Sequence, residues 1–414
     1  MLHKFRFSNY RCYADEVVFD LTAMPLKEHK DTLNEINGVG ILPVAAFYGA
    51  NASGKSTFFM AMNRMSSIIV DRYLAQKQNA DIKSRVFTSP FMFDKALEDK
   101  ETLFEATVMI DSYEYRYGFT CNKQTIISEF LFKKKISKNK TIEKNIFFRN
   151  SDSLTCGIIN KKQQAELEYC FSMSSEKSLM LTDVGMREKD DELSNVFSWF
   201  LLNGSSLPMD SSAFCESSFC ESFIGNMLNG YDGKRFAKNY KKFIHEIDPS
   251  ISDIIPTEET DPDGDKYYIA KTLHKYNGQE FTVRISAESE GTKKIMFVSF
   301  ILFRALEEGL CLFLDELDAK IHPLILQRII KMFTSKETNP RGAQLVFSAH
   351  NLVNFNADDL RRDEIWIVEK TDQKSRIFSL GSCEDGIVRS DLNFSKCYLD
   401  GRFGGVPFQK GADK

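Results

Sequence analysis

Nine consecutive residues, Gly49 to Thr57, combine two glycines, a lysine and hydroxyl side chains in the order Gly-Ala-Asn-Ala-Ser-Gly-Lys-Ser-Thr. This order matches the phosphate-binding loop, in which glycine torsions turn successive N–H groups towards one anion. We predict that Lys55 reaches the β- and γ-phosphates and that the Ser56 hydroxyl ligates Mg²⁺. The residues expected to bind the phosphates are Gly49, Asn51, Ala52, Ser53, Gly54, Lys55, Ser56 and Thr57. The predicted ligand is a nucleoside triphosphate.

The sequence on both sides of this loop predicts the elements that must hold it. The apolar run Val44–Tyr48 predicts a buried strand, and Phe58, Met62, Met65 and Ile69 share the face of a helix. Strand, glycine loop and helix are the context that a phosphate-binding loop requires. A chance glycine-rich turn is the alternative, and the two matching flanks argue against it.

Two adjacent carboxylates, Asp315 and Glu316, follow the apolar run Leu310–Leu314. An acid in this position after a strand holds the hydration shell of Mg²⁺ in phosphate-loop enzymes. A second carboxylate beside it can accept a proton from the attacking water. We therefore predict a metal-binding Asp315 and a catalytic Glu316. The alternative is a pair of acids that only cap the following helix.

Two further positions suggest contacts with phosphate. His350 follows the apolar run Gln344–Ser348, at the end of a strand where α/β sheets bind ligands, and we predict that it donates to the γ-phosphate. A structural histidine is the alternative. Ser289 and Gly291 precede an apolar helix, so a hydroxyl and helix N–H groups would face one anion. Ordinary helix capping is the alternative for this pair.

The order of these motifs resembles the ABC class of ATPases, in the non-transporter branch that includes chromosome-maintenance and recombination-repair heads and bacterial phage-defence ATPases. Within that branch the chain is similar to the AbiL-type abortive-infection ATPases and to the ATPase subunit of the PARIS anti-phage system. The resemblance covers roughly residues 1–120 and 265–407. The matching stretches are Phe7–Arg11, Gly49–Thr57, Glu288–Thr292, Leu314–Pro323 and Tyr398–Pro407.

The resemblance implies that two heads pair and enclose two ATP molecules. Ser289 and Gly291 of one subunit would then face the phosphate loop of the other, and Asp318 would lie at the subunit contact. Arg11 would approach the phosphates, as the corresponding arginine does in that branch. The sequence departs from the ABC-class pattern at two points. The signature lacks the Leu-Ser-Gly-Gly-Gln form, and no glutamine is found that would link the metal to a lobe. Gln344 lies in the wrong strand for that role.

The predicted fold class is α/β, an ABC-ATPase head with a mainly parallel core sheet, an antiparallel β lobe and an inserted helical lobe. We expect residues 1–159 to form the first part of the head and residues 160–264 to form the inserted lobe, with contacts to partners. Residues 265–414 would complete the head. Smaller expectations are a hairpin in 1–20, a connecting loop in 21–43, a β meander from 102 and a closing hairpin of Ile365–Val368 with Arg376–Leu380.

Composition limits the classes of function. The net charge of the 414-residue chain is −4, so the overall charge does not indicate binding to nucleic acid. A local basic patch could still bind it. The nine cysteines lack paired spacing; Cys215 and Cys220 are the closest to a pair but do not suffice for a zinc site. Free thiols and the absence of a leader indicate the cytoplasm. The most apolar stretch, Ile295–Leu306, is too short to span a membrane.

Our leading prediction is an ATP-hydrolysing switch subunit of an anti-phage abortive-infection system, with ATP and Mg²⁺ as cofactors. It would assemble as a homodimer or higher homo-oligomer and control a separate effector, such as a nuclease. The alternative is a DNA-repair or chromosome-associated ATPase that clamps DNA. Its support is a basic run comprising Lys133, Lys134, Lys135, Lys138, Lys140 and Lys144. A transporter ATPase is a third reading, which the closing Gly401–Gly405 segment disfavours.

Overall fold

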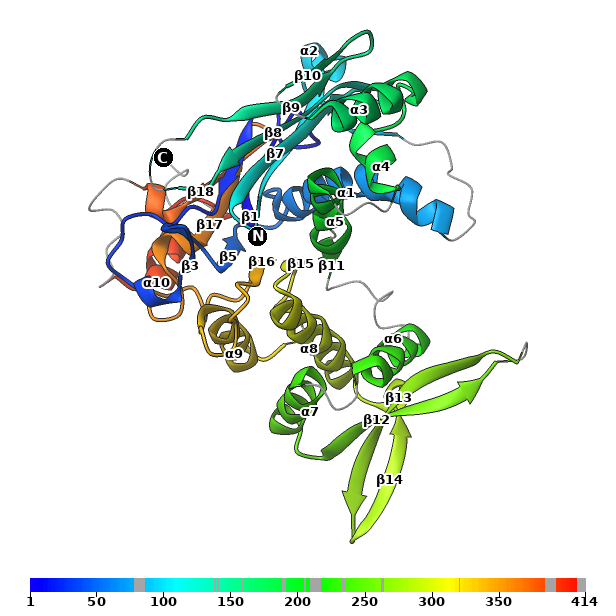
Figure 1. Ribbon diagram of the computed structural model, residues 1–414. Coiled ribbons are helices and arrows are strands. Elements are labelled where there is room, and N and C mark those ends of the chain that lie inside the picture. Colours follow the sequence, from blue (N-terminus) through cyan, green and yellow to red (C-terminus); the bar gives the residue numbers. More distant parts are fainter. Residues whose placement is uncertain are drawn as a thin grey trace. The chain divides into compact units, whose positions relative to one another are not determined.

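The computed structural model describes residues 1–77, 86–137, 139, 141–157, 160–187, 191–204, 206–208, 217–231, 235–261, 264–319, 321–383 and 392–407. Within them the chain has a mixed α/β fold (Figure 1), which confirms the α/β part of the predicted class, while the arrangement of the lobes stays a prediction. Lys138, Lys140 and Cys215, named above, lie outside the described residues. The chain divides into two compact units, and the three domains expected from the sequence remain a prediction. The first unit comprises Met1–Leu207, Cys311–Asp315 and Gln344–Lys414, and the second comprises Pro208–Leu310 and Glu316–Ala343.

A six-stranded sheet forms the centre of the first unit. Its four middle strands are parallel, and the last strand returns as an antiparallel hairpin partner. The strands in sheet order are β11 (Ser206–Pro208), β15 (Cys311–Asp315), β16 (Gln344–Ser348), β5 (Val44–Tyr48), β17 (Ile365–Thr371) and β18 (Lys374–Ser379). Every residue of β5 and β16 is buried, as expected for parallel strands covered on both faces. The predicted parallel strands and the closing hairpin are confirmed.

A seven-stranded antiparallel sheet forms the second layer of this unit (Figure 1). The strands in sheet order are β10 (Leu154–Cys156), β9 (Lys144–Arg149), β8 (Ile126–Lys135), β7 (Tyr113–Cys121), β6 (Thr102–Ile110), β1 (Leu2–Ser8) and β2 (Val17–Asp20). The predicted hairpin and meander are both present, and β1 joins them by pairing with β6. The strands of the seven-stranded sheet all lie between Leu2 and Cys156, whereas those of the six-stranded sheet lie between Val44 and Ser379.

The expectation that residues 21–43 form only a connecting loop is wrong. They contain a short 3₁₀ helix, η1 (Lys30–Thr32), and a small hairpin of β3 (Asn34–Ile36) and β4 (Val39–Ile41). Asn37 and Gly38 form the turn and both have positive φ angles, 48° and 78°. Asn-Gly is the most favourable pair for such a two-residue turn, so the sequence of these two residues could have predicted the hairpin.

Helix α1 (Lys55–Lys77) packs against both sheets through fully buried phenylalanines. The ring of Phe58 lies 5.9 Å from Phe5 of β1, 5.2 Å from Phe19 of β2 and 4.4 Å from Phe47 of β5. Phe59 contacts Phe313 of β15 at 6.3 Å. The remaining helices of this unit are α2 (Lys95–Glu98), α3 (Lys161–Met173), α4 (Met180–Gly185), α5 (Glu192–Asn203) and α10 (Phe394–Leu399), with 3₁₀ helices η4 (Arg362–Glu364) and η5 (Leu380–Ser382).

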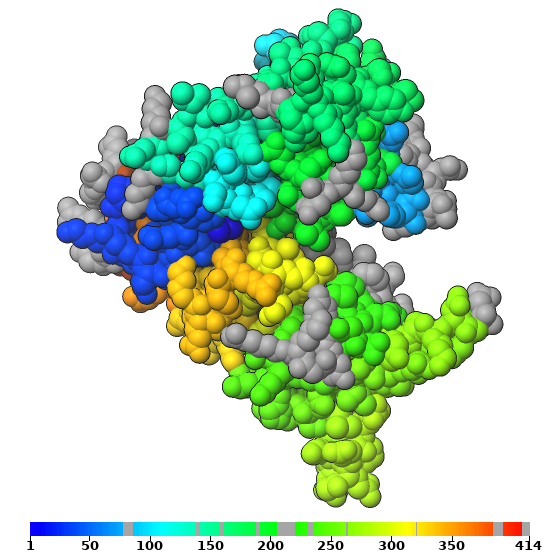
Figure 2. Space-filling model, in the orientation of Figure 1, coloured from blue at the N-terminus to red at the C-terminus, as the bar shows by residue number. Residues whose placement is uncertain are grey.

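The second unit combines helices with a three-stranded antiparallel sheet. Its elements are α6 (Ser217–Tyr231), α7 (Arg235–Ile247), β12 (Ile251–Thr260), β13 (Lys266–Tyr276), β14 (Gln279–Arg284), η3 (Ile285–Ala287), α8 (Glu290–Glu308) and α9 (Pro323–Thr334). The buried ring of Phe300 on α8 contacts Phe236 and Tyr240 of α7 at 5.0 and 5.3 Å. The hairpin of β13 and β14 extends away from α6, α7 and α8 (Figure 1), and Figure 2 shows the same projection in space-filling form. No helix in the described ranges is long and apolar enough to cross a membrane.

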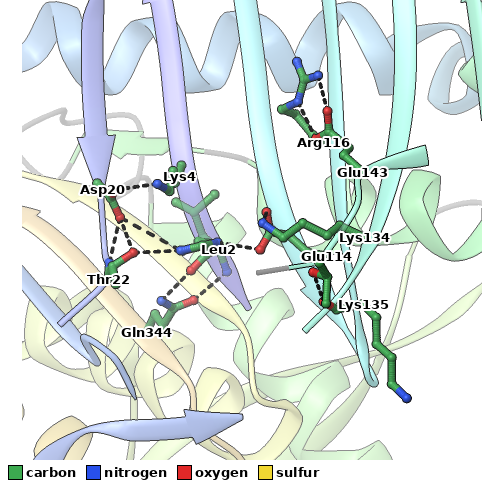
Figure 3. A network of polar contacts seen from close by, with 12 residues as sticks. Leu2, Lys4, Asp20, Thr22, Glu114, Arg116, Lys134, Lys135, Glu143 and Gln344 are labelled. Carbon is green, nitrogen blue, oxygen red and sulfur yellow. Dashed lines mark hydrogen bonds and ion pairs between the residues drawn. The ribbon is translucent and has the colours of Figure 1, made fainter. Parts of the chain in front are cut away.

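Polar contacts join the two sheets of the first unit at the amino end of β16 (Figure 3). The amide of Leu2 donates to Gln344 Oε1 at 2.7 Å, and Gln344 Nε2 donates to the Leu2 carbonyl at 2.9 Å. Nearby, burial opposes ionisation of Glu114, but contacts with His3 and Lys134 lower its pKa to about 2. Gln344 thus has structural partners, in agreement with its exclusion from a metal-linking role.

A buried carboxyl group lies immediately before β17. Glu364 is 1% exposed and accepts a hydrogen bond from the Arg361 amide at 2.9 Å. Arg361 is itself fully buried and donates two hydrogen bonds to Asp363, at 2.9 and 2.8 Å. Burial, with a smaller contribution from the Asp363 charge, raises the pKa of Glu364 to about 8. Glu364 is therefore largely protonated in the folded protein at neutral pH.

Glu364→Gln is expected to flatten the pH dependence of stability. The folded wild type retains this proton up to about pH 8, whereas the unfolded chain releases it near 4.5. Between these values the wild type should lose about 1.4 kcal/mol of unfolding free energy per pH unit relative to the variant. Urea unfolding followed by tryptophan fluorescence reports this, because Trp199 and Trp366 both belong to the first unit. A difference that stays constant with pH would contradict the raised pKa.

Candidate nucleotide-binding site

The loop between β5 and α1 requires glycine at two positions. A Cβ on Gly49 would lie 2.2 Å from the carbonyl oxygen of Val368 on β17. Gly54 has φ of 117°, and a Cβ there would lie 2.7 Å from Ser375 Oγ. Both the space and the torsion therefore exclude a side chain at Gly54. The backbone passes so close to β17 and β18 only because these residues have no side chain.

Two carbonyl groups of this loop, those of Ser53 and Gly54, are bonded by side chains from other segments of the chain. Ser375 Oγ donates to the Ser53 carbonyl at 2.6 Å, and Tyr13 Oη donates to the Gly54 carbonyl at 3.1 Å. Burial raises the pKa of Tyr13 well above its usual value, so its hydroxyl remains a donor. With these two carbonyls bonded to Ser375 and Tyr13, backbone N–H groups at the start of α1 can converge on an anion.

Lys55 lies within the curve of the loop. Its ammonium group donates to the carbonyls of Gly49 and Ala50, at 2.7 and 3.1 Å, and the residue is only 6% exposed. Asn51 and Ala52 are exposed at the tip of the loop, whereas Ser56 and Thr57 are half-buried on the first turn of α1. Hydrogen bonds thus fix the Lys55 ammonium group, and the next two residues carry the hydroxyl groups predicted to bind phosphate and Mg²⁺.

Asp315 and His350 lie at the same edge of the parallel sheet. Asp315 ends β15 and accepts a hydrogen bond from Ser348 Oγ, at the end of β16, at 2.5 Å. His350 is exposed two residues further on. Ser348 pairs with Phe47 of β5, two residues before Gly49. The carboxyl ends of three neighbouring strands therefore bring Asp315, His350 and the phosphate loop together, as expected from parallel pairing.

Arg11 is exposed beside helix α1. It lies in a left-handed turn with φ of 52°, and its amide donates to the Ser89 carbonyl at 2.7 Å. One guanidinium nitrogen lies 3.1 Å from the sulfur of Met60, one helical turn beyond Ser56. In this position the Arg11 guanidinium lies near the first turns of α1, where the phosphates are predicted to bind. Its contact with phosphate remains a prediction.

The signature-like residues belong to the second unit. Ser289 is the N-cap of α8, and its hydroxyl accepts a hydrogen bond from the Thr292 amide at 3.1 Å. A Cβ on Gly291 would meet only Ser289 Oγ, at 3.9 Å. Ser289 therefore caps the helix, as the alternative interpretation of this pair predicts. The open first turn of a 19-residue helix also retains the dipole and the space for an anion.

Glu316 and Asp318 lie in the turn that follows β15 and are assigned to the second unit. Glu316 has φ of 56°, a left-handed torsion that is unusual for a glutamate and common at functional sites. Its carbonyl accepts from the Ala319 amide at 3.1 Å, and the Asp318 carbonyl accepts from the Ile321 amide at 3.1 Å. The structure therefore divides the predicted site residues between two units. Their assigned roles remain predictions.

Several residues that support the phosphate loop were not predicted from the sequence. They are Tyr13, Ser348, Ser375 and the pair Tyr398 and Gly405. Ser348 is adjacent to the predicted His350 segment, and Gly405 belongs to a stretch noted only for its resemblance. The sequence around Ser375 does not predict its contact with the loop, because an isolated serine in a strand is common. Only strand order shows that it contacts the loop.

The donor set fits Mg²⁺ with a nucleotide. No cluster of three His, Cys, Asp or Glu side chains suited to a metal occurs in the part of the chain that the structure describes. Mg²⁺ does not require one, because it is usually held by one or two protein oxygens together with water and phosphate oxygens. Asp315 and Ser56 would provide those oxygens.

One family of protein domains matches most of the chain. A model of the family described as "AAA domain, putative AbiEii toxin, Type IV TA system" matches residues 44–156 and 188–354, more than half of the chain. No curated protein matches at a significant level. Among solved structures, the SMC head domain from Thermotoga maritima is 13% identical with a TM-score of 0.43, over 91% of this chain and 98% of that chain.

A second similar structure is the Smc head domain with an extended coiled coil bound to the C-terminal domain of ScpA, derived from Pyrococcus furiosus. It is 12% identical with a TM-score of 0.39, over 92% of this chain and 96% of that chain. At these TM-scores the two structures carry no argument about this chain.

Gly54→Ala is expected to weaken nucleotide binding by roughly tenfold or more, because strain of about 1–3 kcal/mol would distort the loop. The matched control is Gly278→Ala, which introduces the same kind of strain at φ of 76° in open space between β13 and β14. Fluorescence titration with a labelled ATP analogue measures both affinities. Equal affinities for the two variants would contradict the assigned loop geometry.

Proposed function

The chain belongs to this family of AAA domains, and we propose that it is an ATP-hydrolysing switch subunit whose heads assemble in pairs around ATP. Membership supports ATPase activity in general and the use of a nucleotide with Mg²⁺. The observation that carries the proposal is the glycine loop whose Ser53 and Gly54 carbonyls are bonded by Ser375 and Tyr13, with the Lys55 ammonium group held by the Gly49 and Ala50 carbonyls inside its curve. This arrangement has the shape and charge that a polyphosphate requires.

Each residue has a physical role in the proposed reaction. Lys55 balances phosphate charge, and Ser56 and Asp315 hold Mg²⁺, which would neutralise charge on the phosphate oxygens. Ser348 holds the Asp315 carboxylate in place by the 2.5 Å hydrogen bond. Glu316 orients the attacking water and accepts its proton. His350 donates to the γ-phosphate from the end of β16.

The proposed pairing of two copies uses two predicted sets of anion-binding groups. The phosphate loop and the start of α8 are separate anion sites, on the first and second units. In the proposed assembly Ser289 and Gly291 of one copy bind the γ-phosphate held by the loop of the other. Asp318 lies at the contact, and Arg11 adds a further positive charge near the phosphates. ATP thus stabilises the pair, and hydrolysis releases it.

The proposed setting is bacterial anti-phage defence. The motif order resembles the AbiL-type ATPases and the PARIS ATPase subunit, and the family description names a putative AbiEii toxin. We therefore place a separate toxic effector, such as a nuclease, under control of the assembled state. Deletion of the gene should increase phage sensitivity, and the effector should co-purify. Normal phage resistance together with no co-purifying protein would argue against this setting.

The residues that the structure describes offer no specific support for a DNA clamp. Within the described part of the basic run, Lys133 pairs with Glu192, at 2.5 Å, and Lys134 with Glu114, at 3.1 Å. Lys133 also lies 4.0 Å from the ring centre of Tyr113. Two of these charges are thus already engaged within the protein. We therefore keep the switch as the single proposal.

Lys55→Ala is expected to weaken ATP binding by roughly a hundredfold, because it removes a charge-assisted contact with the phosphates. Equilibrium titration of the full chain with Mg²⁺-ATP measures the change. A matched control is Lys95→Ala, which removes an exposed lysine of α2 in the same unit. Unchanged affinity of Lys55→Ala would overturn the assignment of the loop.

Glu316→Gln is expected to retain ATP and to trap the assembled state, with turnover lower by roughly 10²- to 10⁴-fold. Phosphate release gives the rate, and light scattering with and without ATP gives the size of the assembly. Glu337→Gln removes an exposed carboxylate of the second unit and serves as the control. Hydrolysis by Glu316→Gln at the wild-type rate would refute its role as the base.

A further inference from the structure

A glycine-rich stretch after α10 contacts the phosphate loop directly. The Gly405 carbonyl accepts hydrogen bonds from the Ala50 amide and from Tyr398 Oη, each at 2.8 Å. Gly404 and Gly405 have φ of 72° and 70°. A Cβ would lie 2.4 Å from Glu369 Oε2 at Gly404 and 2.6 Å from Ile367 Cγ2 at Gly405. Glycine is therefore required for the backbone to reach the loop along β17.

The same stretch also holds the backbone that follows His350. Ser395 Oγ, on the first turn of α10, lies 2.7 Å from the Leu352 carbonyl and 2.9 Å from the Phe355 carbonyl. These carbonyls lie two and five residues after His350. One short helix is thus bonded to the segment that follows the predicted γ-phosphate sensor.

An aromatic cluster connects these two contacts. The buried ring of Phe355 lies 4.6 Å from Tyr48, the last residue of β5 before Gly49. It also lies 5.3 Å from Tyr398 and 6.5 Å from Phe403. The side chain after the His350 segment therefore packs on both the strand that leads into the phosphate loop and the stretch that bonds to it.

We propose that residues 394–406 position the phosphate loop and the His350 segment relative to each other, with Tyr398 and Ser395 as positioning residues. This inference rests on the proposed function. The two segments leave neighbouring strands β5 and β16, and their relative placement beyond the sheet depends on contacts made outside it. The 394–406 segment supplies such contacts to both, through one backbone carbonyl and one hydroxyl.

The two positioning residues should affect different steps. Tyr398 acts through the Gly405 carbonyl on Ala50, at the entrance of the loop that binds phosphates of ATP and ADP alike. Ser395 acts on the segment after His350, which serves only the γ-phosphate. Loss of the Tyr398 hydroxyl should therefore weaken the binding of both nucleotides. Loss of the Ser395 hydroxyl should slow turnover and leave ADP binding unchanged.

The test uses the full chain with Tyr398→Phe, Ser395→Ala and the control Ser382→Ala. Ser382 donates a hydrogen bond of 2.7 Å to the Ser379 carbonyl, in the same unit but not in the 394–406 segment. We expect Tyr398→Phe to raise Kd for both ATP and ADP roughly fivefold, as one lost hydrogen bond allows. Ser395→Ala should lower kcat roughly fivefold with Kd for ADP at the wild-type value. Ser382→Ala should change neither quantity.

Thermal unfolding of each variant separates positioning from a purely structural role. If Tyr398→Phe and Ser395→Ala lower Tm but leave Kd and kcat at wild-type values, the proposal is overturned. If Tyr398→Phe does not fold, the kcat and ADP affinity of Ser395→Ala decide the matter. A wild-type chain that binds no ATP would refute the proposed function itself, whereas wild-type binding with unchanged variants refutes only the positioning role.

Discussion

The burial of Phe58 between two sheets is the packing interaction on which the candidate site depends. Its ring is fully buried and contacts aromatic rings of β1, β2 and β5. A phenylalanine in such a position contributes about 3–5 kcal/mol relative to alanine. Because Phe58 lies on the first turn of α1, this packing fixes where the helix begins. The amino end of the helix is thereby held at the carboxyl edge of the parallel sheet.

The direction of the loop carbonyls follows from that placement. A chain that leaves β5 and enters α1 within a few residues must turn sharply, and its carbonyls need partners on one side. Tyr13 and Ser375 provide them from positions 41 and 322 residues away along the chain. The anion-binding character of the loop is thus a property of its surroundings as much as of its glycines.

The division of the candidate residues between two compact units suits a switch. Groups that bind phosphate from one side belong to the first unit, and the start of α8 belongs to the second. A nucleotide bound by one such set alone has fewer contacts than one bound by both. In the proposed assembly, the free energy of completing the second set would drive the pairing of two copies, and it would be lost when the γ-phosphate is removed.

The residue order by itself determined the phosphate loop, its flanking strand and helix, and the parallel strands that end at Asp315 and before His350. These features depend on local backbone torsions, hydrophobic period and helix capping, which act over a few residues. The hairpin at Asn37 and Gly38 had a local signal as well, although it was predicted as a loop.

Only the tertiary structure decided which distant residues support the site. Ser375, Tyr13 and Gly405 become partners of the loop because strand order brings β18, the turn after β1 and the stretch after α10 to one edge. Likewise the buried Glu364 is ordinary in sequence, and its pKa of about 8 arises from burial beside Asp363. The contacts of Ser375, Tyr13 and Gly405 with the loop join residues far apart in the chain. Their geometry is set by sheet topology and packing, which no local pattern encodes.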